Sequence, residues 1–228
     1  MTTTPAPLAT RLANAPEPQR AFSFDLARWR AVLEDLPAVD ATVRELPRQL
    51  EREAVRRVVH DRLAAGEVLS AFIPVMIWGG PGGYGASRTR SILTGRRSKA
   101  QVTAPVDPTV ADRLEAAVIK LRRDGPVQAF FLLNNQGRIP YLRGAFFTKW
   151  LYFASAANSL DGEGVAPILD KRVRDWIRNN TDGRPDLSPY NTTDYEAYIE
   201  LLTHWGTGAP SPRTPAQVEL EIFELSRA

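Results

Sequence analysis

A lysine lies inside an aromatic cluster in the segment from Gly144 to Asp170, where it could act as a nucleophile. The aromatic residues around Lys149 are Phe146, Phe147, Trp150, Tyr152 and Phe153. An ammonium group in such surroundings loses part of the hydration that stabilises its charge. A carboxylate brought close to it would complete a nucleophile and its acid/base assistant. Asp170, which follows Lys149 by 21 residues, is the candidate carboxylate.

Both residues also have ordinary structural interpretations. A lysine at a helix start often extends its amine to solvent, and an aspartate before a helix is commonly its N-cap. The two roles of Asp170 are compatible, because the amides that a capping carboxylate satisfies also hold it rigid and ionised. Lys149 and Asp170 are therefore the candidate catalytic residues.

Helices are the elements that must position this pair. We expect one helix from about Gly144 to Asn158 and a second one directly after Asp170. In the segment from Ile168 to Asn180, which contains the second helix, apolar residues recur at helical spacing. These residues are Ile168, Leu169, Val173, Trp176 and Ile177. The intervening loop is rich in glycine and ends at Pro167.

The N-terminal half reads as a tail followed by helices. Residues 1–20 contain four prolines and few apolar residues, so we expect a disordered tail. Apolar spacing predicts helices over Phe22–Leu36, Val43–Ala65 and Val68–Trp78. The glycine-rich stretch 79–90 that follows is expected to be a loop.

Start and stop signals divide the C-terminal half into helices as well. Asp107 and Pro108 predict a helix start, and Gly125-Pro126 predicts its end. Capping-box patterns at Thr193 and Thr214 open the last two helices. Because no repeat and no alternating strand pattern occurs, we predict an all-α fold with residues 21–228 forming a single helical domain.

Composition excludes several kinds of site. The 228 residues are 43% hydrophobic and include no cysteine and two histidines, His60 and His204. Disulfides and iron–sulfur clusters are therefore excluded, and we expect neither a metal nor another cofactor. The sequence has no apolar run of bilayer length and no secretory signal, so the expected location is the cytoplasm without membrane contact.

Basic residues gather around the glycine-rich stretch, although the net charge is only +3. They are Arg88, Arg90, Arg96, Arg97 and Lys99. Such a cluster is suited to contacting phosphates, and equally to forming a solvated basic loop. The glycine spacing matches neither GxGxxG nor GxxxxGK[ST], which argues against a nucleotide site.

Thr148-Lys149 at the head of a helix, with Asp170 in Pro-Ile-Leu-Asp, resembles the helix-hairpin-helix (HhH-GPD) DNA glycosylase superfamily. Within it the chain is most similar to divergent bacterial 8-oxoguanine DNA glycosylases of the OGG fold. The resemblance implies two interlocked helical subdomains with the active site in the cleft between them. It also implies a hairpin and catalytic region over about residues 138–180, and a last helix that closes the base pocket.

The resemblance further implies roles for individual residues. Lys149 would attack C1′ of the sugar, and Asp170 would stabilise the cation-like sugar and move protons. Three further roles concern the base and the phosphates. Phe153 would stack on the extruded base, Tyr84 would act as a wedge beside Ser87, and Arg88 would read the orphaned base. Gly144 is the glycine retained from the family hairpin that holds a phosphate; the family reads Leu-Pro-Gly-x-Gly there, whereas this chain has Tyr-Leu-Arg-Gly-Ala-Phe-Phe.

The implied activity is release of a damaged or modified base, first 8-oxoguanine, from double-stranded DNA by a monomer that associates with the nucleoid. Strand nicking through a lysine Schiff base would accompany it. Three alternatives remain: a glycosylase for hypermodified phage DNA bases, a catalytically inactive helical DNA-binding protein, and a helical protein-interaction module.

Overall fold

The computed structural model describes residues 2–15, 19–98 and 103–227, and helices dominate them. Within these ranges the strands β1 (Phe22–Ser23) and β2 (Gln49–Leu50) form one short antiparallel pair. The predicted all-α class is therefore confirmed. None of the helices in the described ranges is long and apolar enough to cross a membrane.

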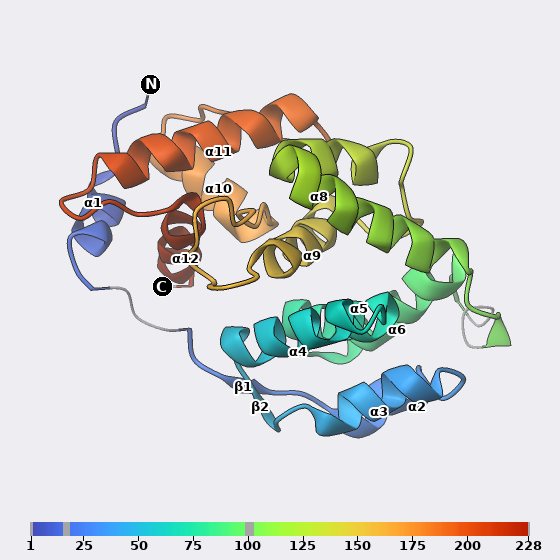
Figure 1. Ribbon diagram of the computed structural model, residues 1–228. Coiled ribbons are helices and arrows are strands. Elements are labelled where there is room, and N and C mark those ends of the chain that lie inside the picture. The colour runs from blue at the N-terminus through green and yellow to red at the C-terminus, as the bar shows by residue number, and fades with distance from the viewer. Residues whose placement is uncertain (1, 16–18, 99–102, 228) are drawn as a thin grey trace.

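The helices form two groups (Figure 1). The first consists of α2 (Leu26–Ala31), α3 (Pro37–Glu45), α4 (Arg52–Ala64), α5 (Val68–Gly79) and α6 (Gly83–Thr94). The second consists of α1 (Ala6–Leu12), α8 (Thr109–Asn134), α9 (Gly144–Ser155), α10 (Lys171–Asn180), α11 (Thr192–Thr207) and α12 (Pro215–Leu225). Because α1 precedes the first group in sequence but packs on α12, the two groups are interlocked.

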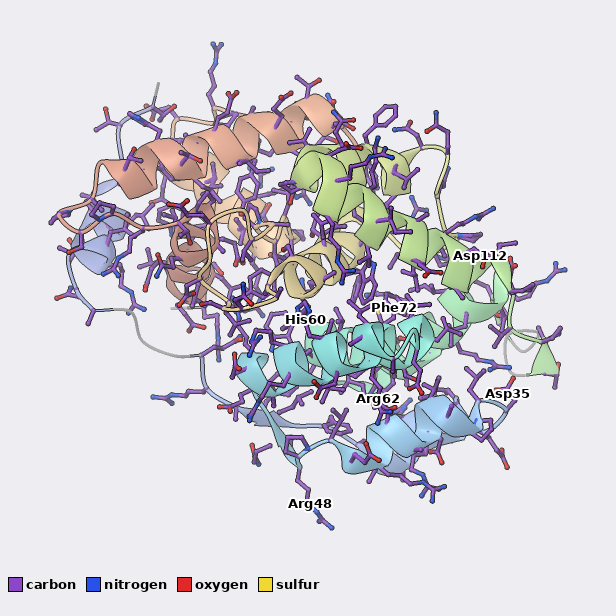
Figure 2. All side chains as sticks on the ribbon, in the orientation of Figure 1. Asp35, Arg48, His60, Arg62, Phe72 and Asp112 are labelled. Carbon is purple, nitrogen blue, oxygen red and sulfur yellow. The ribbon has the colours of Figure 1, made fainter. Side chains whose placement is uncertain are left out.

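Helix α9 lies at the seam between the groups, where it contacts α4, α5 and α8. Phe72 of α5 meets Trp150 of α9 edge to face, with 5.6 Å between ring centroids. The ring of His60, which points from α4 toward α9 in Figure 2, forms a 2.9 Å hydrogen bond with the carbonyl oxygen of Phe153. These contacts fix α9 relative to the first group.

The N-terminal segment differs from the expected disordered tail. Residues 6–12 form α1, which begins with a proline in its first turn and buries Leu8 and Leu12. Nε of Arg11 donates to a carboxylate oxygen of Glu221 on α12 at 2.7 Å. The expectation of disorder is wrong for this segment, because two leucines suffice to dock a short helix on an apolar neighbour; residues 16–18 lie outside the described ranges.

The two long helices expected before residue 66 are each shorter than predicted. Phe22 and Leu50 lie in the paired strands, which separates them from α2 and α4. Pro37 opens α3 instead of only ending the preceding helix, because proline fits the first helical turn, where its missing N–H has no helical partner. Local apolar spacing did not distinguish these short elements from continuous helix.

The glycine-rich stretch is largely helical, contrary to the expected loop. Only Gly80–Gly82 separate α5 from α6, which begins at Gly83. A β-carbon on Gly85 would lie 1.7 Å from the carbonyl oxygen of Gly80. Glycine is required there because the two backbones touch, and not because a ligand approaches them.

Replacing Gly85 with alanine is therefore expected to lower the free energy of unfolding by about 2–3 kcal/mol, since the turn between α5 and α6 must open. Chemical denaturation of the variant and the wild type measures the difference. Gly82→Ala is the matched control, because a β-carbon at Gly82 would have no neighbour within 4 Å. Equal losses of stability in the two variants would contradict this explanation.

Several predicted helix boundaries are confirmed. Asp107 accepts a hydrogen bond from the backbone N–H of Thr109 at 2.9 Å, just before α8. Gly125 has φ 83° and ψ 178°, so α8 is two helices joined at a kink where the sequence predicted a stop. The Thr214 capping box opens α12 as predicted, whereas α11 is capped by Asn191 instead of Thr193.

Candidate active site

Lys149 projects from the second turn of α9 and is largely buried, with 7% of its surface exposed. Its Nζ donates to the carbonyl oxygen of Ala145 at 3.1 Å and lies 5.7 Å from the ring centroid of Phe146. A β-carbon on Gly79 would lie 2.8 Å from Cδ of Lys149. The end of α5 can therefore pass over the lysine stem only because residue 79 has no side chain.

Asp170 is the N-cap of α10, as the sequence predicts. Its Oδ1 accepts hydrogen bonds from the backbone N–H groups of Arg172 at 3.0 Å and Val173 at 3.2 Å. Its Oδ2 accepts a third hydrogen bond, from Nζ of Lys149, at 3.1 Å. The carboxylate therefore joins the start of α10 to the amine on α9. The two candidate catalytic residues, Lys149 and Asp170, are thus in direct contact.

The segment before Asp170 is fixed by three buried hydroxyl groups. The Tyr195 hydroxyl donates to the carbonyl oxygen of Pro167 at 2.9 Å, and the Tyr198 hydroxyl to that of Ile168 at 2.8 Å. The hydroxyl oxygen of Thr148 accepts from the N–H of Leu169 at 3.2 Å. Satisfied buried hydrogen bonds of this kind hold the carboxylate at a defined distance from the amine.

Electrostatics keep Asp170 ionised. Burial alone would raise the pKa of Asp170, but the ammonium of Lys149 and the amides of Val173 and Arg172 overcome this effect and lower the pKa below its ordinary value. The charged form of the carboxylate is thus the stable one beside Lys149.

Lys149 and Asp170 both line a pocket of about 740 Å³ between the two helix groups, which we call the Lys149 pocket. Its wall includes residues from β1, α4, the end of α5, α9, α10 and α12. Four aromatic residues lie in this wall: Phe22, Trp78, Phe146 and Phe223. The volume is within the range of pockets that enclose small organic ligands.

A buried charge cluster borders the same pocket and was not predicted from the sequence. Arg52 of α4 and Glu219 of α12 lie 3.7 Å apart and are 6% and 1% exposed through their side chains. Arg52 donates to Gln19 at 2.9 Å and to the Tyr152 hydroxyl at 3.3 Å. Burial raises the pKa of Glu219 to about 7, against the opposing charge of Arg52.

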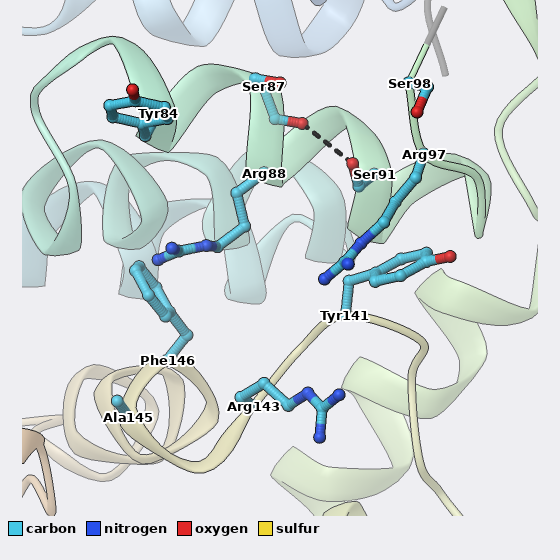
Figure 3. A pocket seen from close by; sticks show the side chains of 10 residues that line it. All are labelled: Tyr84, Ser87, Arg88, Ser91, Arg97, Ser98, Tyr141, Arg143, Ala145 and Phe146. Atoms are coloured by element: carbon cyan, nitrogen blue, oxygen red, sulfur yellow. Dashed lines mark hydrogen bonds between the residues drawn. The ribbon is translucent and has the colours of Figure 1, made fainter. Parts of the chain in front are cut away.

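Arginine and aromatic side chains form a second pocket of about 530 Å³ (Figure 3). The guanidinium of Arg88 lies 4.6 Å from the ring centroid of Phe146, and that of Arg97 lies 4.6 Å from the ring centroid of Tyr141. Ser87 and Tyr84 of α6 also line this arginine–aromatic pocket, with Tyr84 89% exposed. Ala145 and Phe146 line both pockets, so the two are adjacent.

Two residues predicted for the site, Phe153 and Gly144, have packing roles instead. Phe153 is 0% exposed and packs edge to face on Trp78, with 5.2 Å between ring centroids. Its burial removes it as a stacking partner, whereas Phe146 and Phe223 line the Lys149 pocket. Gly144 opens α9, and a β-carbon there would lie 2.4 Å from the carbonyl oxygen of Pro189, so close packing explains the glycine.

The arginines of the basic cluster lie in different environments. Arg90 is 4% exposed and pairs with Asp35 at 2.6 Å, which makes it part of the fold and not a phosphate contact. Arg88 and Arg97 line the arginine–aromatic pocket, whereas Lys99 lies outside the described residues. The described part of the chain contains no group of His, Cys, Asp and Glu side chains that could hold a metal ion.

Comparison with known proteins places this arrangement in a family. A family described as "Putative 8-oxoguanine DNA glycosylase OGG-like protein" matches residues 15–223, which include α2 to α11, most of α12, and both Lys149 and Asp170. No curated protein and no solved structure matches the chain. Because the family match spans nearly the whole sequence, the chain belongs to the OGG-like family of DNA glycosylases.

Proposed function

We propose that the protein extrudes a damaged base, first 8-oxoguanine, from double-stranded DNA and cleaves its N-glycosidic bond with Lys149 as nucleophile and Asp170 as its assistant. The observation that carries this proposal is the 3.1 Å contact between Nζ of Lys149 and Oδ2 of Asp170 inside the Lys149 pocket. An amine and a carboxylate so arranged are suited to attack on a cation-like sugar.

In the proposed reaction the bond between C1′ and the base breaks as positive charge develops on the sugar, and the fixed carboxylate of Asp170 stabilises that charge. Lys149, after giving up a proton, forms the new bond to C1′ through the nitrogen electron pair. The departing base takes up a proton. Opening of the sugar ring then gives a Schiff base, from which loss of the 2′ proton eliminates the 3′ phosphate and nicks the strand.

The arginine–aromatic pocket supports a role in holding DNA from which the base has been extruded. Arg88 and Arg97 combine charge with stacking on aromatic rings, which suits contacts to phosphates and unpaired bases. Tyr84 is exposed on α6 beside this pocket and is the proposed wedge, and Arg88 the proposed reader of the orphaned base. Binding through such cations weakens as salt concentration rises.

The test is release of free base from duplexes that each carry one modification: 8-oxoguanine, an abasic site, a modified cytosine or a hypermodified phage base. Chromatography measures the free base, and borohydride reduction traps the covalent adduct. We expect release and an adduct with 8-oxoguanine. If no duplex yields free base or a covalent adduct, the enzymatic function is overturned. Salt-sensitive binding without these products would then favour an inactive DNA-binding protein. The absence of binding would favour an interaction module.

A further inference from the structure

Three arginines that line the arginine–aromatic pocket carry charges that no acidic side chain balances. They are Arg88, Arg97 and Arg143, all exposed to solvent. The residues that line this pocket include no aspartate or glutamate, and none of the three guanidinium groups forms an ion pair or a hydrogen bond with a residue that the structure describes. Arg90, nearby on α6, instead pairs with Asp35 at 2.6 Å. A concave surface lined by unpaired cations concentrates anions.

Aromatic rings hold two of these cations beside the turn between α8 and α9. The guanidinium of Arg97 lies 4.6 Å from the ring centroid of Tyr141, and that of Arg143 lies 5.8 Å from the ring centroid of Tyr190. Asn134, the last residue of α8, donates to the carbonyl oxygen of Tyr190 at 2.7 Å and so fixes the second ring. A guanidinium placed against a ring keeps its N–H donors available at its edge, where they can meet an acceptor.

The backbone of Tyr141 has a conformation that tyrosine rarely adopts. Its φ is 65°, in the left-handed region that favours glycine. Such a conformation is costly and persists where the surrounding structure requires it, commonly at a binding site. Here it accompanies the contact of the Tyr141 ring with Arg97 (Figure 3), which joins the segment after α6 to the turn before α9. The contact therefore bridges the two groups of helices.

The backbone at the start of α9 is less suited to an anion than these side chains are. A β-carbon at Gly144 would lie 2.4 Å from the carbonyl oxygen of Pro189, so that oxygen occupies the space beside the first residue of the helix. A carbonyl oxygen carries a partial negative charge and repels an anion. An anion that approaches Gly144 from this side meets the oxygen, whereas one that approaches Arg97 and Arg143 meets cationic donors.

We propose that Arg97 and Arg143 bind phosphates of the DNA backbone, so that this turn holds the strand through guanidinium side chains. This inference rests on the proposed function, and names the groups of the arginine–aromatic pocket that bind its DNA. A phosphate diester offers only acceptors and a full negative charge, which matches unbalanced guanidinium groups better than the neutral edge of a base does. Because this pocket and the Lys149 pocket share Ala145 and Phe146, the bound phosphates would lie close to the extruded nucleotide.

The experiment measures affinity over a series of salt concentrations for an undamaged duplex and for one whose 8-oxoguanine nucleotide resists cleavage through a 2′-fluoro group. Arg97→Gln and Arg143→Gln should each weaken binding about 10-fold on both duplexes, because a charge-assisted hydrogen bond is lost. Each should also lower the slope of log affinity against log salt concentration by about 1, since one phosphate contact is lost. A loss confined to the 8-oxoguanine duplex would contradict the inference, because phosphate contacts do not depend on the base.

Matched controls remove the same charge outside the pocket. Arg96 directly precedes Arg97, and Arg138 lies earlier in the turn that ends at Arg143; both are exposed and neither lines the pocket. Their replacement by glutamine should lower the slope by less than about half as much. Tyr141→Gly removes the ring but suits the positive φ, so it should remain folded in thermal melting while its slope falls as in Arg97→Gln. Wild-type slopes in both Arg97→Gln and Arg143→Gln would overturn the inference.

A free nucleotide presents the same phosphate chemistry as the DNA backbone, so a second measurement separates these two sources. Calorimetry measures binding of thymidine monophosphate to the wild type and to Arg143→Gln. Saturable binding that Arg143→Gln loses, together with unchanged duplex affinity, would assign the pocket to a free nucleotide and reject the inference. The undamaged duplex contains no substrate base, so failure of the proposed function is seen separately, as no release of free base from any modified duplex.

Discussion

Replacing Lys149 with glutamine is expected to abolish the borohydride-trapped adduct and to slow base release by about 10³-fold or more, because the proposed nucleophile is lost. Glutamine keeps most of the length of the side chain in a site where only 7% of the lysine is exposed. Single-turnover assays on the 8-oxoguanine duplex measure base release, and electrophoresis after borohydride reduction measures the adduct.

Lys171→Gln is the matched control for this prediction. Lys171 also lines the Lys149 pocket, but its side chain is 78% exposed and pairs with Asp175. This variant should retain the adduct, with a modest loss of DNA affinity from the removed charge. An undiminished adduct in Lys149→Gln would show that another amine reacts. Full base release without an adduct would instead identify an enzyme in which Asp170 directs water.

Replacing Asp170 with asparagine is expected to slow base release by about 10²–10⁴-fold while leaving part of the adduct with preformed abasic DNA. In the proposed reaction, base release needs a negative charge beside the cation-like sugar, whereas attack of Lys149 on the aldehyde of an abasic site does not. Comparison of the two substrates therefore separates the role of the carboxylate from that of the amine. Equal losses on both substrates would contradict this division of roles.

The same position also has a structural role that a second variant isolates. Asparagine caps a helix about as well as aspartate, so Asp170→Asn should keep α10 intact, whereas Asp170→Ala should lose about 1 kcal/mol more of stability. Because the pKa of Asp170 is lowered in the folded protein, its ionised form stabilises the fold above a pH of about 3.8 and this contribution is lost as pH falls through the lowered pKa. The stability difference between wild type and Asp170→Asn should therefore shrink on acidification.

The sequence predicted the parts of the site that depend on local rules. Asp170 precedes an apolar helical face, so its capping position could be derived without the fold, and Lys149 could be placed on the preceding helix. Their contact depends on Tyr195, Tyr198 and Thr148, which fix the segment before Asp170 from another helix and from α9. Spacing alone does not encode such contacts.

The errors have a common cause in long-range packing. Helical spacing placed Phe153 near Lys149 but could not tell which helix face is covered by Trp78. Glu219 lies in a helix whose glutamates, seen in sequence alone, resemble solvated charges, whereas in the fold it is buried 3.7 Å from Arg52 of α4. The glycines of α6 suggested a loop, because glycine disfavours helices unless a neighbouring backbone requires it, as at Gly85.

The docking of α1 on the second group has a consequence for how the protein is made. The Arg11–Glu221 contact joins residues 210 apart in sequence, and Trp205 likewise donates to the carbonyl oxygen of Thr2 across 203 residues. During synthesis α4 and α5 can pair early, but the wall that carries Glu219 exists only after residues 215–225 have left the ribosome. Contacts of such long range form late in folding. A nascent chain should therefore already hold Lys149 beside Asp170 while its pocket still lacks the wall that α12 supplies.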